Sequence, residues 1–261
     1  MTRIRFASAD GVGRITLTRP EKKNALDRDA VNELGAALAH CSTDNTVRSV
    51  LLDAEGTDFC AGADLAALAT LVGAGAQAQH DDAMALGNVF VAMREMAKPV
   101  VAAVRGRALA GGAGLATACD IVLAADDAQF GYPEVRVGFV PAMVMTMLRR
   151  AAGEKQAFDL VATGRVLSAR EAFEVGLVSR VVPAGTLDAA ALHVARGLAA
   201  SPPGALSFTK RLFYDLDGRP FREGIALGAK VNVEARATTE FKDGVRRFLE
   251  GKEKGGGTRP S

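Results

Sequence analysis

The fold of this chain is decided by the stretch Arg107-Ala108-Leu109-Ala110-Gly111-Gly112-Ala113-Gly114-Leu115. An apolar, β-branched run, Pro99–Val104, precedes it, and Leu115–Cys119 follows it. This order predicts a buried strand, a glycine turn and a short helix. The first N–H groups of a helix lack intrahelical acceptors, and the helix dipole is positive there. The turn is therefore a candidate site for a phosphate or for an oxygen that becomes negative only during a reaction.

Strands and helices alternate on both sides of this turn. We expect a hairpin turn at Ser8–Gly11 and a helix that begins after Asp27 as N-cap and runs to about Cys41. Ala66–Asp82 is rich in Ala and Gly and fits either a helix or a mobile loop beside a site. The alternation predicts an α/β protein with a mainly parallel sheet. The expected strands are Ile4–Ala7, Val12–Leu17, Val47–Asp53, Val100–Val104, Asp120–Ala125 and Val178–Val182.

Helical patterning dominates the C-terminal part of the chain. We therefore divide the chain into a core at residues 1–196 and a helical region at residues 197–261. The expected helices are Ala189–Ala200, Gly204–Tyr214, Arg222–Arg236 and Thr239–Leu249.

Composition and charge exclude several classes of protein. The 32 basic and 30 acidic residues of the 261-residue chain leave a net charge of +2 without a basic stripe, so nucleic acid is not expected as a partner. No apolar run approaches the ~20 residues of a membrane span, and the N-terminus lacks a signal-peptide core, so we expect a cytoplasmic protein without membrane contact. The 3 cysteines and 3 histidines are scattered, which indicates neither a disulfide framework nor a metal site.

A dinucleotide-binding fingerprint is one alternative for the glycine turn. Gly112-Ala113-Gly114 begins like that motif, but Thr117 stands where its third glycine or alanine belongs. No acidic residue ends a second strand ~20 residues further on. The other alternative is that these glycines only allow tight packing between strand and helix.

An ordered set of motifs goes further than any one of them. The set is Asn24-Ala25-Leu26, Phe59-Cys60-Ala61-Gly62-Ala63-Asp64, Ala110-Gly111-Gly112, Cys119-Asp120-Ile121 and Phe130-Gly131-Tyr132-Pro133-Glu134. In its order and spacing it resembles the crotonase family, the enoyl-CoA hydratase/isomerase superfamily. The resemblance implies a crotonase-like spiral of ββα units and a C-terminal α-helical region that mediates trimers, often paired into hexamers. It also implies a coenzyme A thioester as substrate, with no separate cofactor and no metal.

The resemblance places the reaction at three positions. Two backbone N–H groups, of Ala63 and Gly111, would bind the thioester oxygen, and Glu134 would be the acid/base. Removing a proton beside a thioester, or adding a nucleophile across a conjugated double bond, puts negative charge on that oxygen. Fixed donors stabilise the charged state more than the neutral one, and losing one donor costs roughly 3–4 kcal/mol in barrier height. An apolar pocket around Glu134 would raise its pKa.

Further positions correspond to substrate contacts of the family. Asp64 also fits the N-cap of the following helix, Met143 belongs to a methionine-rich segment that suits an acyl chain or a helix core, and Phe248 and Lys252 correspond to residues lent by a neighbouring subunit. The expected substrate-binding residues are Lys23, Ala25, Leu26, Ala61, Asp64, Leu65, Gly112, Gly114, Tyr132, Pro133, Met143, Phe248 and Lys252.

One position departs from the family pattern. Hydratases with two glutamates carry the first of them where this chain has Gly114. A pair of carboxylates can hold a water for addition to a double bond, whereas one carboxylate suffices to move a proton between two carbons. The single carboxylate taken alone favours an isomerase, whereas the general resemblance favours a hydratase. On the resemblance we expect an enoyl-CoA hydratase-like enzyme with a single Glu, in fatty-acid or branched acyl-CoA metabolism. A Δ3-Δ2 enoyl-CoA isomerase is the alternative enzyme, and a non-catalytic acyl-CoA-binding scaffold subunit is the alternative of another class.

Overall fold

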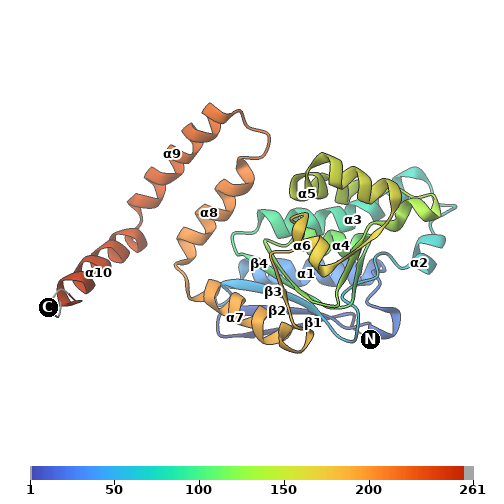
Figure 1. Cartoon of the computed structure of the whole chain (residues 1–261), viewed down its shortest axis with the longest axis horizontal. Helices are drawn as coiled ribbons and strands as arrows, with labels where there is room; N and C mark the ends of the chain where they lie inside the picture. The colour runs from blue at the N-terminus through green and yellow to red at the C-terminus, as the bar shows by residue number, and fades with distance from the viewer. Residues whose placement is uncertain (1, 256–261) are drawn as a thin grey trace. The chain divides into compact units, whose positions relative to one another are not determined.

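The chain consists of two compact units. The computed structural model describes residues 2–255, with side chains as far as Glu250, and divides into Met1–Ala200 and Ser201–Ser261 (Figure 1). The boundary that we expected after residue 196 falls inside α7 (Leu187–Ala200), whereas the structure places the boundary after the last residue of this helix. This helix stays with the first unit through its last turn, because Ala191, Ala195 and Ala199 are all buried.

The first unit is built on a six-stranded sheet. Its strands, in spatial order, are β1 (Ile4–Ala9), β2 (Val12–Leu17), β3 (Ser49–Ala54), β4 (Val100–Val104), β6 (Ile121–Ala125) and β9 (Arg180–Val182). β1 pairs with β2 antiparallel, and every other pair is parallel. Asp10 and Gly11 turn the hairpin with φ angles of 53° and 77°, as its tight connection requires. The predicted α/β class, mainly parallel sheet and hairpin are confirmed.

A second, smaller sheet was not predicted. It is formed by β5 (Arg107–Leu109), β7 (Gln129–Gly131) and β8 (Val166–Ser168), with β5 parallel to β7 and β8 antiparallel to it. Strands of three residues are too short to show an alternating hydrophobic pattern. This sheet matters for the site because it continues directly into the glycine turn.

Helices cover both faces of the large sheet. Ser49 Oγ of β3 donates to the Ala195 carbonyl of α7 over 2.7 Å, and a Cβ on Gly13 of β2 would lie 2.9 Å from Sγ of Cys41 in α1 (Arg28–Thr43). Ser49 pairs with Val12, the residue before Gly13, and successive side chains of a strand point to opposite faces of the sheet. The helices α7 and α1 therefore lie on opposite faces. The helices are α1 (Arg28–Thr43), capped by Asp27 as expected, α2 (Leu65–Ala69), α3 (Ala76–Glu95), α4 (Gly111–Ala118), α5 (Ala142–Thr163), α6 (Ala169–Glu174) and α7, with short 3-10 turns η1 (Pro20–Lys22), η2 (Pro133–Val137) and η3 (Ala184–Thr186).

The uncertain segment Ala66–Asp82 is neither one helix nor a loop. α2 ends at Ala69, a turn follows, and α3 begins at Ala76. Gln79 holds the turn by donating to the carbonyl groups of Leu71 and Ala74.

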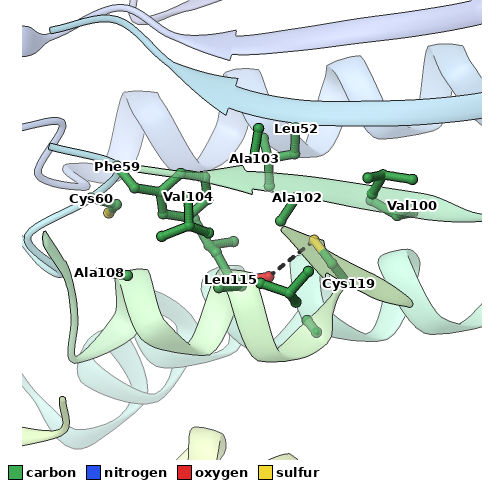
Figure 2. Close-up of a cluster of buried hydrophobic side chains, with 14 of the residues drawn as sticks. Leu52, Phe59, Cys60, Val100, Ala102, Ala103, Val104, Ala108, Leu115 and Cys119 are labelled. Carbon is green, nitrogen blue, oxygen red and sulfur yellow. Dashed lines mark hydrogen bonds between the residues drawn. The ribbon is translucent and has the colours of Figure 1, made fainter. Parts of the chain in front are cut away.

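The core packs α4 closely against β4. Figure 2 shows Leu115 of α4 and Cys119, the C-cap residue of that helix, near Ala102 and Val104 of β4, all of them buried. Small residues such as Ala102 let a helix approach the strand. The position of the glycine turn, at the start of α4, is therefore fixed by well-packed apolar contacts.

The described part of the second unit consists of helices and the short turns that join them. It contains α8 (Pro203–Asp215), α9 (Phe221–Ala237) and α10 (Thr239–Gly255), close to the predicted ranges. Glu240 at the start of α10 accepts from the backbone N–H groups of Gly204 and Ala205. None of the helices in the described part of the chain is long and apolar enough to cross a membrane.

Gly106 lies at the crossing of two segments, between β4 and β5. Its φ is +50°, and a Cβ there would lie 1.9 Å from the Thr57 carbonyl oxygen. We predict that Gly106→Ala destabilises the protein by about 1–3 kcal/mol or more, measured by urea unfolding. Gly185→Ala is the control, because nothing lies within 4 Å of the added Cβ. Equal stability of the two variants would contradict this interpretation of the crossing.

Candidate active site

The loop after β3 is held between two neighbouring segments. Cys60 forms a parallel bridge to Ala108 of β5, donating to the Arg107 carbonyl and accepting from the N–H of Leu109. On the other side, Leu26 bridges Ala63, donating to the Gly62 carbonyl and accepting from the N–H of Asp64. The loop is thus a short extended segment with a fixed register on both edges.

This register determines where the N–H of Ala63 points. The Gly62 carbonyl points at the N–H of Leu26, which lies 2.8 Å away. In a trans peptide the carbonyl and the following N–H point in opposite directions, and the described chain has no cis peptide bond. The N–H of Ala63 therefore points away from Leu26.

The N–H of Gly111 points out of the start of α4 for the same reason. The Ala110 carbonyl accepts the first helical hydrogen bond, from Gly114, over 3.0 Å. It therefore points along the helix, and the N–H of Gly111 in the same peptide points the opposite way. A Cβ on Gly62 would lie 3.4 Å from the Gly111 nitrogen and 2.9 Å from the Leu109 oxygen. The two turns therefore meet, and glycine at position 62 (φ +94°) keeps the space between them open.

The backbone between β5 and α4 is strained. Ala110, the residue before the helix, has φ 52° and ψ −123°, a region that glycine favours. The N–H of Ala110 donates to the Gly131 carbonyl over 2.8 Å, and the Ala110 carbonyl accepts the first hydrogen bond of the helix. Strain of this kind persists only where the surroundings enforce it, and it is concentrated at functional sites.

Buried polar side chains that the sequence did not reveal hold the first loop. Asn24 is 2% exposed and donates to the carbonyl groups of Glu55 and Asp58, while its own oxygen accepts from the N–H of Arg19. Asp58 binds the guanidinium of Arg107 through both oxygens, at 2.6 and 2.8 Å, and this pairing lowers the pKa of its carboxyl. In a sequence, such residues look like ordinary loop residues. Asn24 alone of these residues belongs to a motif that carries the family resemblance, and this motif is the feature of the sequence that points to it.

Glu134 lies on η2 and has an unusual environment. Its Oε2 atom is buried without a hydrogen-bond partner among the described residues, and burial raises the pKa of the carboxyl. An unpaired buried carboxylate oxygen costs free energy, and carboxyl groups with a raised pKa are more common at functional sites than elsewhere. The 3-10 turn is fixed by Pro133 at its start and by the N–H of Phe139, which donates to the Glu134 carbonyl.

Gly114 is a packing position in this chain. A Cβ there would lie 2.4 Å from Cγ1 of Val144 and 2.9 Å from Cζ of Phe90. The place that a first glutamate occupies in two-glutamate relatives is thus filled by apolar side chains from α5 and α3. Gly112 is also packed tightly, since its Cβ would lie 2.2 Å from the Cys60 oxygen. Neither glycine offers a substrate contact beyond its backbone.

Several expected substrate contacts are engaged inside the protein. Both backbone groups of Leu26 bind the loop, and the N–H groups of Ala61 and Asp64 donate to Lys23 and Leu26. These particular groups are therefore engaged within the protein, and the expected substrate contacts of Leu26, Ala61 and Asp64 stay predictions. The Asp64 side chain caps α2, as the alternative interpretation expected.

The exposed candidates of the same segments remain available. Leu65 is 67% exposed, Lys23 is exposed, and Ala25 is half-buried. The Ala25 carbonyl accepts from the guanidinium of Arg19. The expected ligand contacts of Lys23, Ala25 and Leu65 stay predictions.

The remaining candidates divide between the two units. Tyr132 is fully buried and its hydroxyl lies 2.8 Å from that of Thr117. Its expected contact with the substrate stays a prediction. Pro133 and Met143 are half-buried, and Met143 packs against the core. Phe248 is 63% exposed on the second unit. Lys252 lies where α10 has no described side chains.

Comparisons with known proteins show which family this chain is similar to. The model of the enoyl-CoA hydratase/isomerase family matches residues 7–255. A Thermus thermophilus protein whose name is that of an enoyl-CoA hydratase is 42% identical over 236 residues, 90% of this chain and 93% of the relative.

Solved structures share the fold. A Mycobacterium smegmatis enoyl-CoA hydratase superposes with a TM-score of 0.90 at 30% identity, covering 95% of this chain and 96% of its own. Human enoyl-CoA hydratase domain-containing protein 3 gives 0.90 at 29% identity, covering 95% and 97%. The chain belongs to the enoyl-CoA hydratase/isomerase family and has the crotonase fold.

The burial of Glu134 predicts a pH-dependent stability difference. A carboxyl whose pKa is raised in the folded state binds its proton more tightly there, so stability falls as the pH rises from the ordinary value of 4.5 through the folded-state pKa. We predict that Glu134→Gln is more stable than the wild type at pH 7, by roughly 1 kcal/mol. The gain should vanish near pH 4. Urea unfolding at both pH values measures it, and a gain that is equal at both would contradict the assignment.

The packing at Gly114 predicts coupling with Val144. Gly114→Ala should destabilise the protein by about 1–3 kcal/mol because its Cβ overlaps Val144. In a Val144→Ala background the same substitution should cost less, since the overlapping methyl group is gone. A double-mutant cycle on unfolding free energies measures the difference, and purely additive effects would show that the two side chains do not compete for space.

Proposed function

We propose that the chain is a hydratase-like enzyme that acts on an enoyl-CoA thioester, with Glu134 as its single acid/base. The observation that carries the proposal is the buried Oε2 atom of Glu134 without a partner. The outward N–H groups of Ala63 and Gly111 supply the matching donors. The names of the relatives favour hydration as the reaction.

Hydration can proceed with one carboxylate. Glu134 takes a proton from a water molecule, whose oxygen bonds to C3 of the enoyl group. The C2–C3 double bond opens and its electrons move onto the thioester oxygen, where the N–H groups of Ala63 and Gly111 stabilise the negative charge. The protonated Glu134 then returns its proton to C2, and the carbonyl re-forms. A carboxyl with a raised pKa suits both proton transfers.

Isomerisation is the second candidate, and Gly114 favours it. Val144 and Phe90 fill the place of a second carboxylate, so the chain lacks that partner for holding a water. In this case Glu134 removes a proton from C2 of a 3-enoyl thioester and returns it to C4, through the same charged oxygen. The double bond moves into conjugation, and no water takes part.

We also propose that the protein works as a homo-oligomer, a trimer or a dimer of trimers. The support is the exposed apolar surface of the second unit, where Phe213, Phe221 and Ile225 are 61–83% exposed. Large apolar side chains with this exposure are typical of interaction surfaces. Location in the cytoplasm and the absence of a separate cofactor stay predictions.

Replacing the proposed acid/base separates an enzyme from a scaffold subunit. We predict that Glu134→Gln lowers kcat by about 10²–10⁴-fold while the Kd for coenzyme A, measured by calorimetry, stays within a factor of ~2. Turnover at the wild-type rate would sink the role of Glu134. A wild type that binds coenzyme A but converts no thioester would favour the scaffold.

Two substrates distinguish the two reactions. Crotonyl-CoA and a 3-enoyl-CoA are incubated separately with the wild type, and the conjugated absorbance is followed. Loss of absorbance with crotonyl-CoA indicates hydration, and gain with the 3-enoyl-CoA indicates isomerisation.

A further inference from the structure

The two segments that carry the proposed reaction run side by side before they diverge. β5 and β7 pair in parallel as far as Leu109 and Gly131, and the N–H of Ala110 then donates to the Gly131 carbonyl over 2.8 Å. Beyond this point the segment of β5 continues into α4, whose first turn presents the N–H of Gly111. The segment of β7 continues into η2, which carries Glu134.

A pair of buried hydroxyl groups joins the segments again after they diverge. Tyr132, at the start of η2, is fully buried, and its hydroxyl lies 2.8 Å from Oγ1 of Thr117 in α4. Thr117 donates its proton to the Ala113 carbonyl, also over 2.8 Å. The Tyr132 hydroxyl is therefore the donor of the shared bond.

The surroundings keep this bond formed. Burial raises the pKa of Tyr132, and the nearby charge of Glu134 adds to the rise, so the phenol remains a donor. Thr117 is 8% exposed, which excludes most competition from water. The side chain of Tyr132 thus links the start of η2, directly before Pro133, to the second turn of α4.

We propose that Tyr132 and Thr117 are positioning residues that set Glu134 relative to the N–H of Gly111. Neither side chain touches the substrate in this assignment. Their bond fixes the separation of the acid/base from the donors that bind the thioester oxygen. The inference rests on the proposed function, because it assigns a task to Glu134 as the acid/base.

Removing the phenol hydroxyl tests the proposal without leaving an unpaired group. In Tyr132→Phe, Thr117 keeps its bond to Ala113, so the fold should be retained. We expect kcat to fall roughly 10- to 100-fold, because small displacements of reacting groups have effects of this size. KM should change by less than about threefold, since binding of coenzyme A does not involve the pair. The assay uses crotonyl-CoA or the 3-enoyl-CoA, whichever the wild type converts.

A double-mutant cycle shows whether the two hydroxyl groups act as a unit. Thr117→Val should lower kcat to a similar extent, and adding Tyr132→Phe should bring little further loss. Thr117→Ser keeps the hydroxyl and should retain most of kcat. Ser49→Ala is the matched control, since it removes another buried hydroxyl bond, to Ala195, and should lower Tm but not kcat.

The outcomes separate this proposal from the proposed function. An unchanged kcat in Tyr132→Phe, or losses that simply multiply in the double variant, would overturn the positioning role. A loss of activity in Thr117→Ser as large as that in Thr117→Val would also overturn it. If Glu134→Gln retains full turnover, the proposed function fails instead.

Discussion

Stabilisation of a charged oxygen at this site depends on the direction of two peptide planes. The Gly62 carbonyl is directed to Leu26, and the Ala110 carbonyl is directed along α4. Because a trans peptide holds its two polar groups in opposition, each of these bonds points the next N–H, of Ala63 or Gly111, away from its own segment. In the proposed function, these hydrogen bonds inside the fold prepare donors for the thioester oxygen, and no side chain is needed to supply them. Preorganised donors of this kind cost no reorganisation during a reaction.

Glu134 differs from the two N–H groups, because its position has a cost in stability. Its carboxyl is held where burial raises the pKa and one oxygen finds no partner, so the fold accepts a local loss of stability. The strained backbone of Ala110 is a second local cost. Both costs are offset by the apolar packing of α4 and β4, where the side chains of Val104 and Leu115 are completely buried. A rigid core of this kind allows a protein to keep unfavourable groups in place.

The large features of the fold could be predicted because they rest on long patterns. All six strands of the main sheet overlap strands that the hydrophobic pattern predicted, and the C-terminal helices show clear amphipathic spacing. The small sheet could not be predicted from strands of three residues. At the site, Glu134 and the glycine turn were visible as motifs. Asn24, buried under the loop, was visible only as part of a motif, and its task was not.

Contacts between distant segments were beyond the sequence for a different reason. Val144 and Phe90 lie on separate helices, and nothing in their local patterns shows that they meet at Gly114. The sequence revealed that a carboxylate is missing there, but the structure was needed to show that apolar side chains fill its place. In the same way, the pairing of Tyr132 with Thr117 depends on how η2 and α4 diverge. Such contacts decide what the site can do, and they come from the tertiary fold rather than from local propensity.

The most direct measurement of the central claim is vibrational. Infrared difference spectroscopy on the full chain, with a coenzyme A thioester labelled with ¹³C at its carbonyl, reports the polarisation of that bond when it is bound. Two N–H groups aimed at one oxygen predict a carbonyl band at lower frequency than in the free thioester. A bound thioester whose carbonyl band stays at the free frequency would contradict the account.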